Sequence, residues 1–167
     1  ELAALFRKPS PVSVRLLDAG DPPPDLEPLT LPGWAGDARM FRCPDPPAFF
    51  VSEAWKSGRF YVQDPSTLLA PGLLAPTCGE RVADLCCAPG GKARYLSERV
   101  EPDGRVVCLD RSVQRIHRAA ENLAARPACF LVVGDARRPP LAPASLDAVL
   151  VDVPCSNTGV VRRRPDV

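Results

Sequence analysis

The sequence has a single histidine, and its seven cysteines include no Cys-x-x-Cys pair. Structural zinc sites take four Cys or His ligands at short spacings, so we expect no metal site here. No apolar run approaches the ~20 residues that a membrane-spanning helix needs, and no signal-peptide pattern opens the chain. The net charge of +1 is close to neutral and neither favours nor excludes a nucleic-acid partner. We therefore expect a globular protein without membrane or metal.

Four of the cysteines lie within apolar runs, namely Cys86, Cys87, Cys108 and Cys129. In such runs a free cysteine behaves as a small buried hydrophobic residue. Because the total is odd and no disulfide framework is indicated, we expect the reducing cytoplasm as the compartment.

The 167 residues suffice for one domain with a small appendage. Many of the 21 prolines fall early and break the first third of the chain into short pieces. There, Val12–Leu16 alternates like a strand, and residues 49–51 are a second short strand candidate. Residues 66–74 are apolar and favour a helix that Pro71 interrupts.

From residue 81 onward, apolar runs alternate with helical patterns. The runs predict strands at 81–87, 105–109, Cys129–Val133 and 146–151, with helices at 92–100 and 113–125 between them. Apolar strands separated by helices are typical of an α/β protein whose parallel sheet is covered on both faces.

Each predicted strand ends at or close to an acidic residue: Asp84, Asp110, Asp135 or Asp152. In open α/β sheets the ligand binds at the carboxyl ends of the strands. The Pro-Gly-Gly turn before the helix at 92–100 lets the backbone approach a ligand closely. Asp110 follows 19 positions after Gly91, a spacing that suits a ribose diol. These features predict a cofactor that contains a nucleoside.

A second constellation follows the last predicted strand, where Asp152, Pro154 and Cys155 stand close together. Proline fixes the backbone beyond the strand, so the carboxylate and the thiol are expected to face one crevice. A thiol at such an edge is a candidate nucleophile or proton handler.

Three segments together resemble the RNA (cytosine-5) methyltransferases of the RsmB/Sun family. The family pattern D-x-C-A-A-P-G-G-K-T is matched at 84–93, where Cys87 and Ala93 replace Ala and Thr. The pattern D-A-P-C-S-G-T-G-x-x-R-R-x-P-D is matched at 152–166, where Val153 and Asn157 replace Ala and Gly. The pattern F-x-x-G-x-x-x-x-Q-D-x-A-S is echoed at 55–67. The resemblance covers residues 55–167 well and the earlier part loosely.

The resemblance implies S-adenosyl-L-methionine as cofactor and RNA, expected to be ribosomal RNA, as substrate. It implies a Rossmann-like class I methyltransferase fold with a partial parallel sheet. We expect a small N-terminal α+β subdomain for RNA at 1–60, a cofactor-binding domain at 61–167, and a monomer. The cofactor residues it implies are Cys86, Cys87, Ala88, Pro89, Gly90, Gly91, Lys92, Asp110, Arg115, Asp135 and Asp152.

The resemblance gives Cys155, Asp152 and Lys92 catalytic roles and gives Arg162 and Arg163 contacts with RNA. Family members use a second cysteine, in a later Thr-Cys-Ser motif, as the attacking nucleophile, and no Thr-Cys occurs in these 167 residues. The resemblance therefore implies a C-terminally truncated chain without the main nucleophile.

Two alternatives remain open. The first is a catalytically incompetent module that binds S-adenosylmethionine or RNA. The second is a nicotinamide-dependent oxidoreductase, which requires a G-x-G-x-x-G loop where this chain has Ala88-Pro89-Gly90-Gly91.

Overall fold

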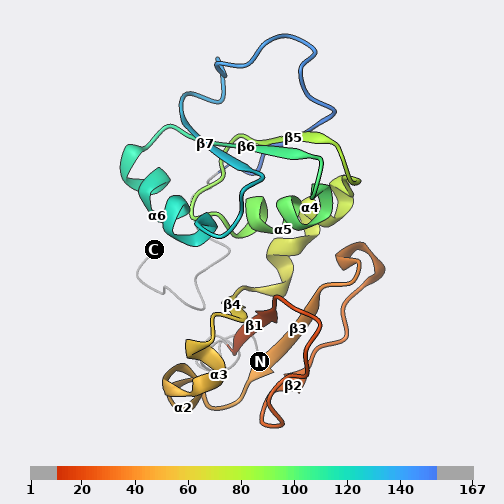
Figure 1. Cartoon of the computed structure of the whole chain (residues 1–167), viewed down its shortest axis with the longest axis vertical. Coiled ribbons are helices and arrows are strands. Elements are labelled where there is room, and N and C mark those ends of the chain that lie inside the picture. The colour runs from red at the N-terminus through yellow and green to blue at the C-terminus, as the bar shows by residue number, and fades with distance from the viewer. Residues whose placement is uncertain (1–10, 154–167) are drawn as a thin grey trace, which may run out of the picture. The chain divides into compact units, whose positions relative to one another are not determined.

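A computed structural model of the chain describes residues 11–153. They form two compact units, 11–65 and Ser66–Val153 (Figure 1). No helix among these residues is long and apolar enough to cross a bilayer.

The first unit is built on a four-stranded antiparallel sheet in the order β2-β3-β1-β4. Its strands are β1 (Val12–Leu16), β2 (Glu27–Pro28), β3 (Arg39–Cys43) and β4 (Phe60–Val62), and its short helices are η1 (Gly33–Ala35), α2 (Pro46–Val51) and α3 (Glu53–Lys56). The predicted strand at Val12–Leu16 is confirmed.

The strand predicted at 49–51 is wrong, because these residues end helix α2. The Asp45 carboxylate caps this helix by accepting a hydrogen bond from the Ala48 amide at 3.2 Å, and Pro46 occupies the first helical position. These start signals outweigh the β-propensity of two phenylalanines and a valine. The helix buries Phe49 against Phe60, with ring centroids 5.3 Å apart.

The second unit contains the predicted parallel sheet, in the order β7-β6-β5-β8. The strands are β5 (Arg81–Asp84), β6 (Arg105–Asp110), β7 (Cys129–Val133) and β8 (Ala148–Leu150), and the helices are η2 (Pro65–Leu68), α4 (Leu69–Leu74), α5 (Gly91–Val100) and α6 (Val113–Leu123). The predicted alternation is confirmed, with β5 ending three residues early at Asp84.

Pro71 does not interrupt the helix at 66–74 as predicted. It lies in the first turn of α4, whose N-cap is Leu68. Amide groups of a first turn have no carbonyl partner within the helix, so proline costs no hydrogen bond there.

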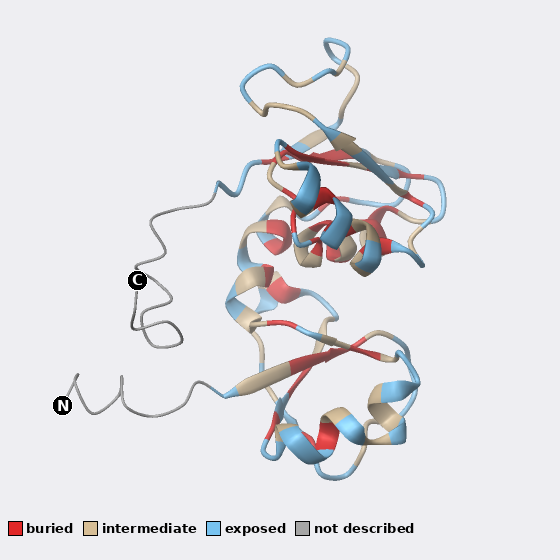
Figure 2. Ribbon diagram, turned by 90° about the vertical axis from the view of Figure 1, so that its left-hand side faces the viewer, coloured by how far each residue is buried: buried red, intermediate tan, exposed pale blue. Residues whose placement is uncertain are grey.

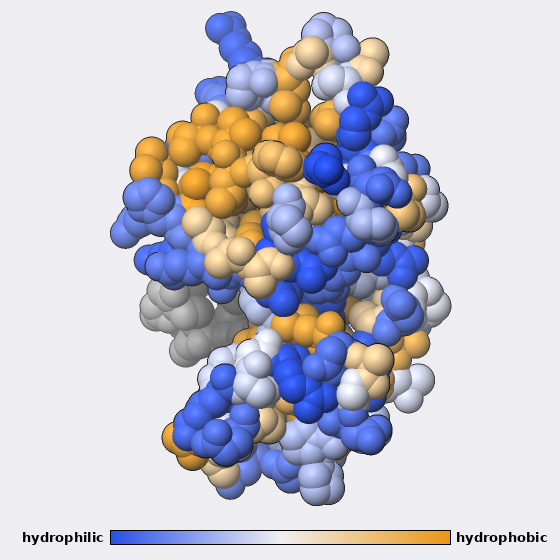
Figure 3. Space-filling model, in the orientation of Figure 1, coloured by the Kyte–Doolittle hydropathy of each residue, from blue (hydrophilic) through white to orange (hydrophobic). Residues whose placement is uncertain are grey.

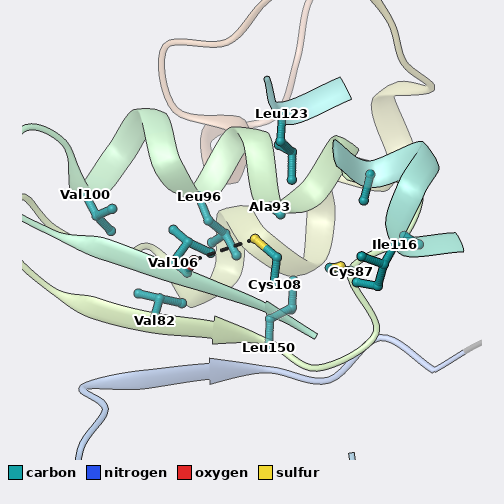
Figure 4. Close-up of a cluster of buried hydrophobic side chains, with 12 residues drawn as sticks. Val82, Cys87, Ala93, Leu96, Val100, Val106, Cys108, Ile116, Leu123 and Leu150 are labelled. Carbon is teal, nitrogen blue, oxygen red and sulfur yellow. Dashed lines mark hydrogen bonds between the residues drawn. The ribbon is translucent and has the colours of Figure 1, made fainter. Parts of the chain in front are cut away.

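The main core of this unit lies between the sheet and helices α5 and α6 (Figure 4). Buried residues, red in Figure 2, occur both in the strands and in the helices that cover them. Their side chains meet between the two layers (Figure 4): Val82, Val106, Cys108 and Leu150 from the strands, and Leu96, Val100, Ile116 and Leu123 from the helices.

Both sheet faces were predicted to be covered, and among the described residues helices cover only one of them. Helices α4, α5 and α6 lie on one side, and the segment between β7 and β8 lies on the other (Figure 1). That segment packs against Ala83 and Leu109 but leaves Phe130 half exposed at 50% and Val149 at 43%. Hydrophobic atoms accordingly gather over β7 on the surface (Figure 3).

Leu96 and Leu73 provide a matched test of the core. Leu96 is fully buried, whereas Leu73 is 67% exposed. Leu96→Ala should lower the free energy of unfolding by about 2–5 kcal/mol, because it removes buried methyl groups and leaves a cavity. Leu73→Ala should change it by about 0.5 kcal/mol or less. Urea denaturation of both variants measures the difference, and equal losses would contradict this assignment of the core.

Candidate functional site

The candidate site lies where the parallel strands end and the chain turns between β5 and α5. The turn bends at Gly90, whose φ of +109° is a backbone conformation that side chains rarely adopt. Its amide donates to the Cys87 carbonyl at 2.7 Å, and helix α5 begins at the next residue, Gly91. The local sequence therefore brings the start of a helix to the carboxyl edge of the sheet.

Asp84 ends β5 beneath this turn and is only 1% exposed. One carboxylate oxygen accepts the Cys86 amide at 3.3 Å, while Oδ2 is buried without a hydrogen-bond partner among the described residues. Burial raises the pKa of Asp84 to about 6. The Cys86 amide and the Lys92 charge oppose this rise, whereas Asp152 and Asp110 add to it. A buried carboxylate oxygen with no donor is costly unless a ligand supplies one.

Asp110 ends β6 and is 5% exposed. Its Oδ1 accepts the Ser112 amide at 3.0 Å, and its Oδ2 lies 3.4 Å from the Arg115 guanidinium. The same guanidinium donates to the Ala88 carbonyl at 2.8 Å, so one side chain joins the strand-end acid to the turn.

Lys92 and Asp152 form an ion pair with Nζ and Oδ2 2.5 Å apart. Lys92 lies in the first turn of α5, and Asp152 follows β8. The pair therefore connects the helix start to the segment that the sequence singled out after the last strand.

The turn itself contributes mostly backbone to the site. The side chains of Cys87 and Ala88 belong to the buried core, and the Cys87 amide donates to the Leu109 carbonyl at 3.0 Å. Cys86 is partly exposed, and burial raises the pKa of its thiol. Such a thiol is a weak nucleophile at neutral pH.

Asp135 is not joined to these residues by any described contact. It follows β7 and binds Arg137 within its own turn, with Oδ2 2.6 Å from the guanidinium. That hydrogen bond lowers the pKa of Asp135 to about 2. Its predicted place in the cofactor site stays a prediction.

Cys155, Arg162 and Arg163 lie outside the described residues, so their roles stay predictions. Within residues 11–153, no group of three or more metal-ligating side chains could hold an ion.

Two residues at the site were missing from the predicted set. Asp84 was noted as a strand-end acid without a role, although its place after a buried strand pointed to this edge. Asn122 donates from Nδ2 to the Pro89 carbonyl at 2.7 Å. The sequence could have indicated this residue, because Asn122 lies seven residues after Arg115 and therefore on the same face of the helix.

Comparison with known proteins gives one family for this arrangement. A family model described as 16S rRNA methyltransferase RsmB/F matches residues 71–167, more than half of the chain. Ribosomal RNA small subunit methyltransferase B of Photorhabdus laumondii is 42% identical over 121 residues, and that of Vibrio cholerae is 42% identical over 119. These alignments cover 70% of this chain in both cases, but the chain spans only 28% and 26% of the two relatives' lengths.

Solved structures show the same fold. A methyltransferase homologue from Pyrococcus horikoshii matches 98% of this chain and 57% of its own, with a TM-score of 0.76 and 25% identity. NSun6 from the same organism, solved with SFG, matches 64% of this chain and 28% of its own, with a TM-score of 0.57 and 29% identity. The predicted Rossmann-like methyltransferase fold is confirmed. The chain belongs to the 16S rRNA methyltransferase RsmB/F family.

Proposed function

We propose that this chain supplies the cofactor-binding part of an enzyme that methylates C5 of cytosine in ribosomal RNA. The observation that carries the proposal is the set of carboxylates around the Gly90 turn, with a buried Asp84 oxygen that has no donor among the described residues.

S-adenosyl-L-methionine fits these residues. It carries a sulfonium and an ammonium group, which the cluster of three carboxylates, Asp84, Asp110 and Asp152, favours electrostatically. The ammonium end suits Asp84 Oδ2, and the ribose diol suits the Asp110 carboxylate, whose oxygens each keep acceptor capacity. The carboxylate end suits the first-turn amides of α5. Asp135 is proposed beside the adenine.

The bound cofactor supplies an electrophilic methyl group. Cytosine C5 becomes a nucleophile once a thiolate adds to C6, a form of covalent catalysis. We assign Asp152, in its protonated form, to donating a hydrogen bond to N3 of the cytosine ring. Lys92 is assigned to holding the other oxygen of this side chain, Oδ2, which lies 2.5 Å from its Nζ. Cys155 is assigned to release of the product after the C5 proton has been removed.

The names of the family and of its relatives support ribosomal RNA as the substrate class. We propose that residues 1–60 and the pair Arg162 and Arg163 contact this RNA, and that 61–167 form the cofactor domain. The protein is proposed to act as a cytoplasmic monomer.

Transfer of labelled methyl groups tests the proposed function. The intact protein, incubated with methyl-labelled S-adenosyl-L-methionine and 16S rRNA, should place the label in 5-methylcytidine after digestion to nucleosides. Label at another atom of cytidine would contradict the C5 assignment. Binding of cofactor without any transfer would favour the incompetent binding module.

A further inference from the structure

Two adjacent backbone carbonyls of the turn before α5 are held by side chains of α6. Arg115 Nη2 donates to the Ala88 carbonyl at 2.8 Å, and Asn122 Nδ2 donates to the Pro89 carbonyl at 2.7 Å. The two donors are separated from their acceptors by 27 and 33 positions in the sequence. These contacts therefore depend on α6 being docked beside the turn.

The same face of α6 also packs against the turn. A Cβ atom at Gly90 would lie 3.3 Å from Leu123 Cγ and 3.6 Å from Ala119 Cα. Residues 115, 119, 122 and 123 share one helical face at spacings of four, three and one. Two polar side chains, Arg115 and Asn122, and the apolar residues Ala119 and Leu123 of this face thus contact the turn together.

Arg115 adds a connection that Asn122 lacks. Its Nε lies 3.4 Å from Asp110 Oδ2 while its Nη2 holds the Ala88 carbonyl. The planar guanidinium fork serves both partners at once, whereas a lysine ammonium on a flexible stem is a single point charge. The turn and the strand-end acid are therefore fixed relative to each other by one group.

We propose that Arg115 and Asn122 are positioning residues that hold the turn in its ligand-binding conformation before the ligand arrives. They act through the Ala88 and Pro89 carbonyls and through Asp110. This inference rests on the proposed function only for the identity of the ligand, S-adenosyl-L-methionine. A turn that is already ordered loses little conformational entropy when the ligand binds, so the ligand binds more tightly.

Two conservative substitutions remove the two contacts, each with a matched control on the outward face of the same helix. Arg115→Lys keeps the charge but cannot hold both partners, and Arg118→Lys is its control. Asn122→Asp keeps the shape but replaces the amide donor by a carboxylate, and Gln114→Glu is the control for the same exchange of groups. Arg118 and Gln114 are both exposed.

Amide hydrogen exchange of the ligand-free intact protein is the first readout. In both variants the amides of residues 86–88, 90 and 91 should exchange about tenfold faster, while those of β5 and β6 and the melting temperature stay near the wild-type values. The second readout is calorimetric titration with S-adenosyl-L-methionine, in which each variant should bind roughly tenfold more weakly. In a transfer assay, KM for the cofactor should rise with little change in kcat.

Unchanged exchange at 86–91 in both variants would overturn the proposal, as would equal effects in the controls. A fall in melting temperature without faster loop exchange would mark the contacts as merely structural and would overturn it too. If the wild-type protein binds no S-adenosyl-L-methionine, the proposed function fails, and loop exchange still decides whether Arg115 and Asn122 hold the turn.

Discussion

Asp110→Ala should weaken the binding of S-adenosyl-L-methionine by ~100-fold or more. The carboxylate is 5% exposed at the end of β6 and is proposed to accept both ribose hydroxyls. Each hydrogen bond to a charged group contributes about 1.5–3 kcal/mol, so two of them give about 3 kcal/mol or more, which is a factor of ~100. The substitution also removes the partner of Arg115, 3.4 Å away. Calorimetric titration of the variant measures the loss.

Asp103→Ala is the matched control, because Asp103 is an exposed acid in the turn before β6. It removes the same charge from the same domain and should leave the dissociation constant unchanged. Equal weakening by both substitutions would show that the effect is general electrostatics and would contradict the assignment of Asp110 to the ribose.

The Asp84→Asn variant should gain stability relative to the wild-type protein as the pH rises. Burial raises the pKa of Asp84 from 3.8 to about 6, so between these values the folded protein holds a proton that the unfolded chain has released. The stability that this proton contributes is complete below pH 3.8 and is lost as the pH rises through 6. The difference between the two pKa values corresponds to a change of about 3 kcal/mol in the free energy of unfolding. The stability of Asp84→Asn minus that of the wild type should therefore rise by about 3 kcal/mol between pH 3.5 and 7.5.

Urea denaturation of both proteins across this pH range gives the difference directly, since the other titrating groups cancel. Asp147→Asn supplies a control of opposite sign, because the hydrogen bond from Arg81 lowers the pKa of the Asp147 carboxyl. A stability difference for Asp84→Asn that is independent of pH would contradict the raised pKa.

The parallel sheet was predictable because its signals are local. Continuous apolar runs and helical spacing predicted β6, β7, α5 and α6 closely, and the acidic residues at the strand ends located the ligand edge. The prediction failed at 49–51, where Asp45 and Pro46 start a helix against the propensity of the residues that follow. A capping signal involves only one or two residues, whereas strand propensity adds up over several. The propensity of residues 49–51 therefore favoured a strand, although the cap decides the local conformation.

The remaining errors concern contacts between distant parts of the chain. Apolar strands predicted cover on both sheet faces, but apolarity does not say which element provides the cover. The bond from Asn122 to Pro89 spans 33 positions and depends on how α6 docks. Similarly, Asp84 Oδ2 has no hydrogen-bond partner among residues 11–153 because distant parts of the chain bury it, and a local stretch of sequence does not reveal such burial.

Calorimetric titration of the intact protein with S-adenosyl-L-methionine tests the central claim most directly. We predict binding of one molecule per chain, weakened ~100-fold or more in Asp110→Ala and unchanged in Asp103→Ala. A folded wild-type protein that shows no binding, or one whose binding is unaffected by Asp110→Ala, would contradict the assignment of this strand edge as the cofactor site.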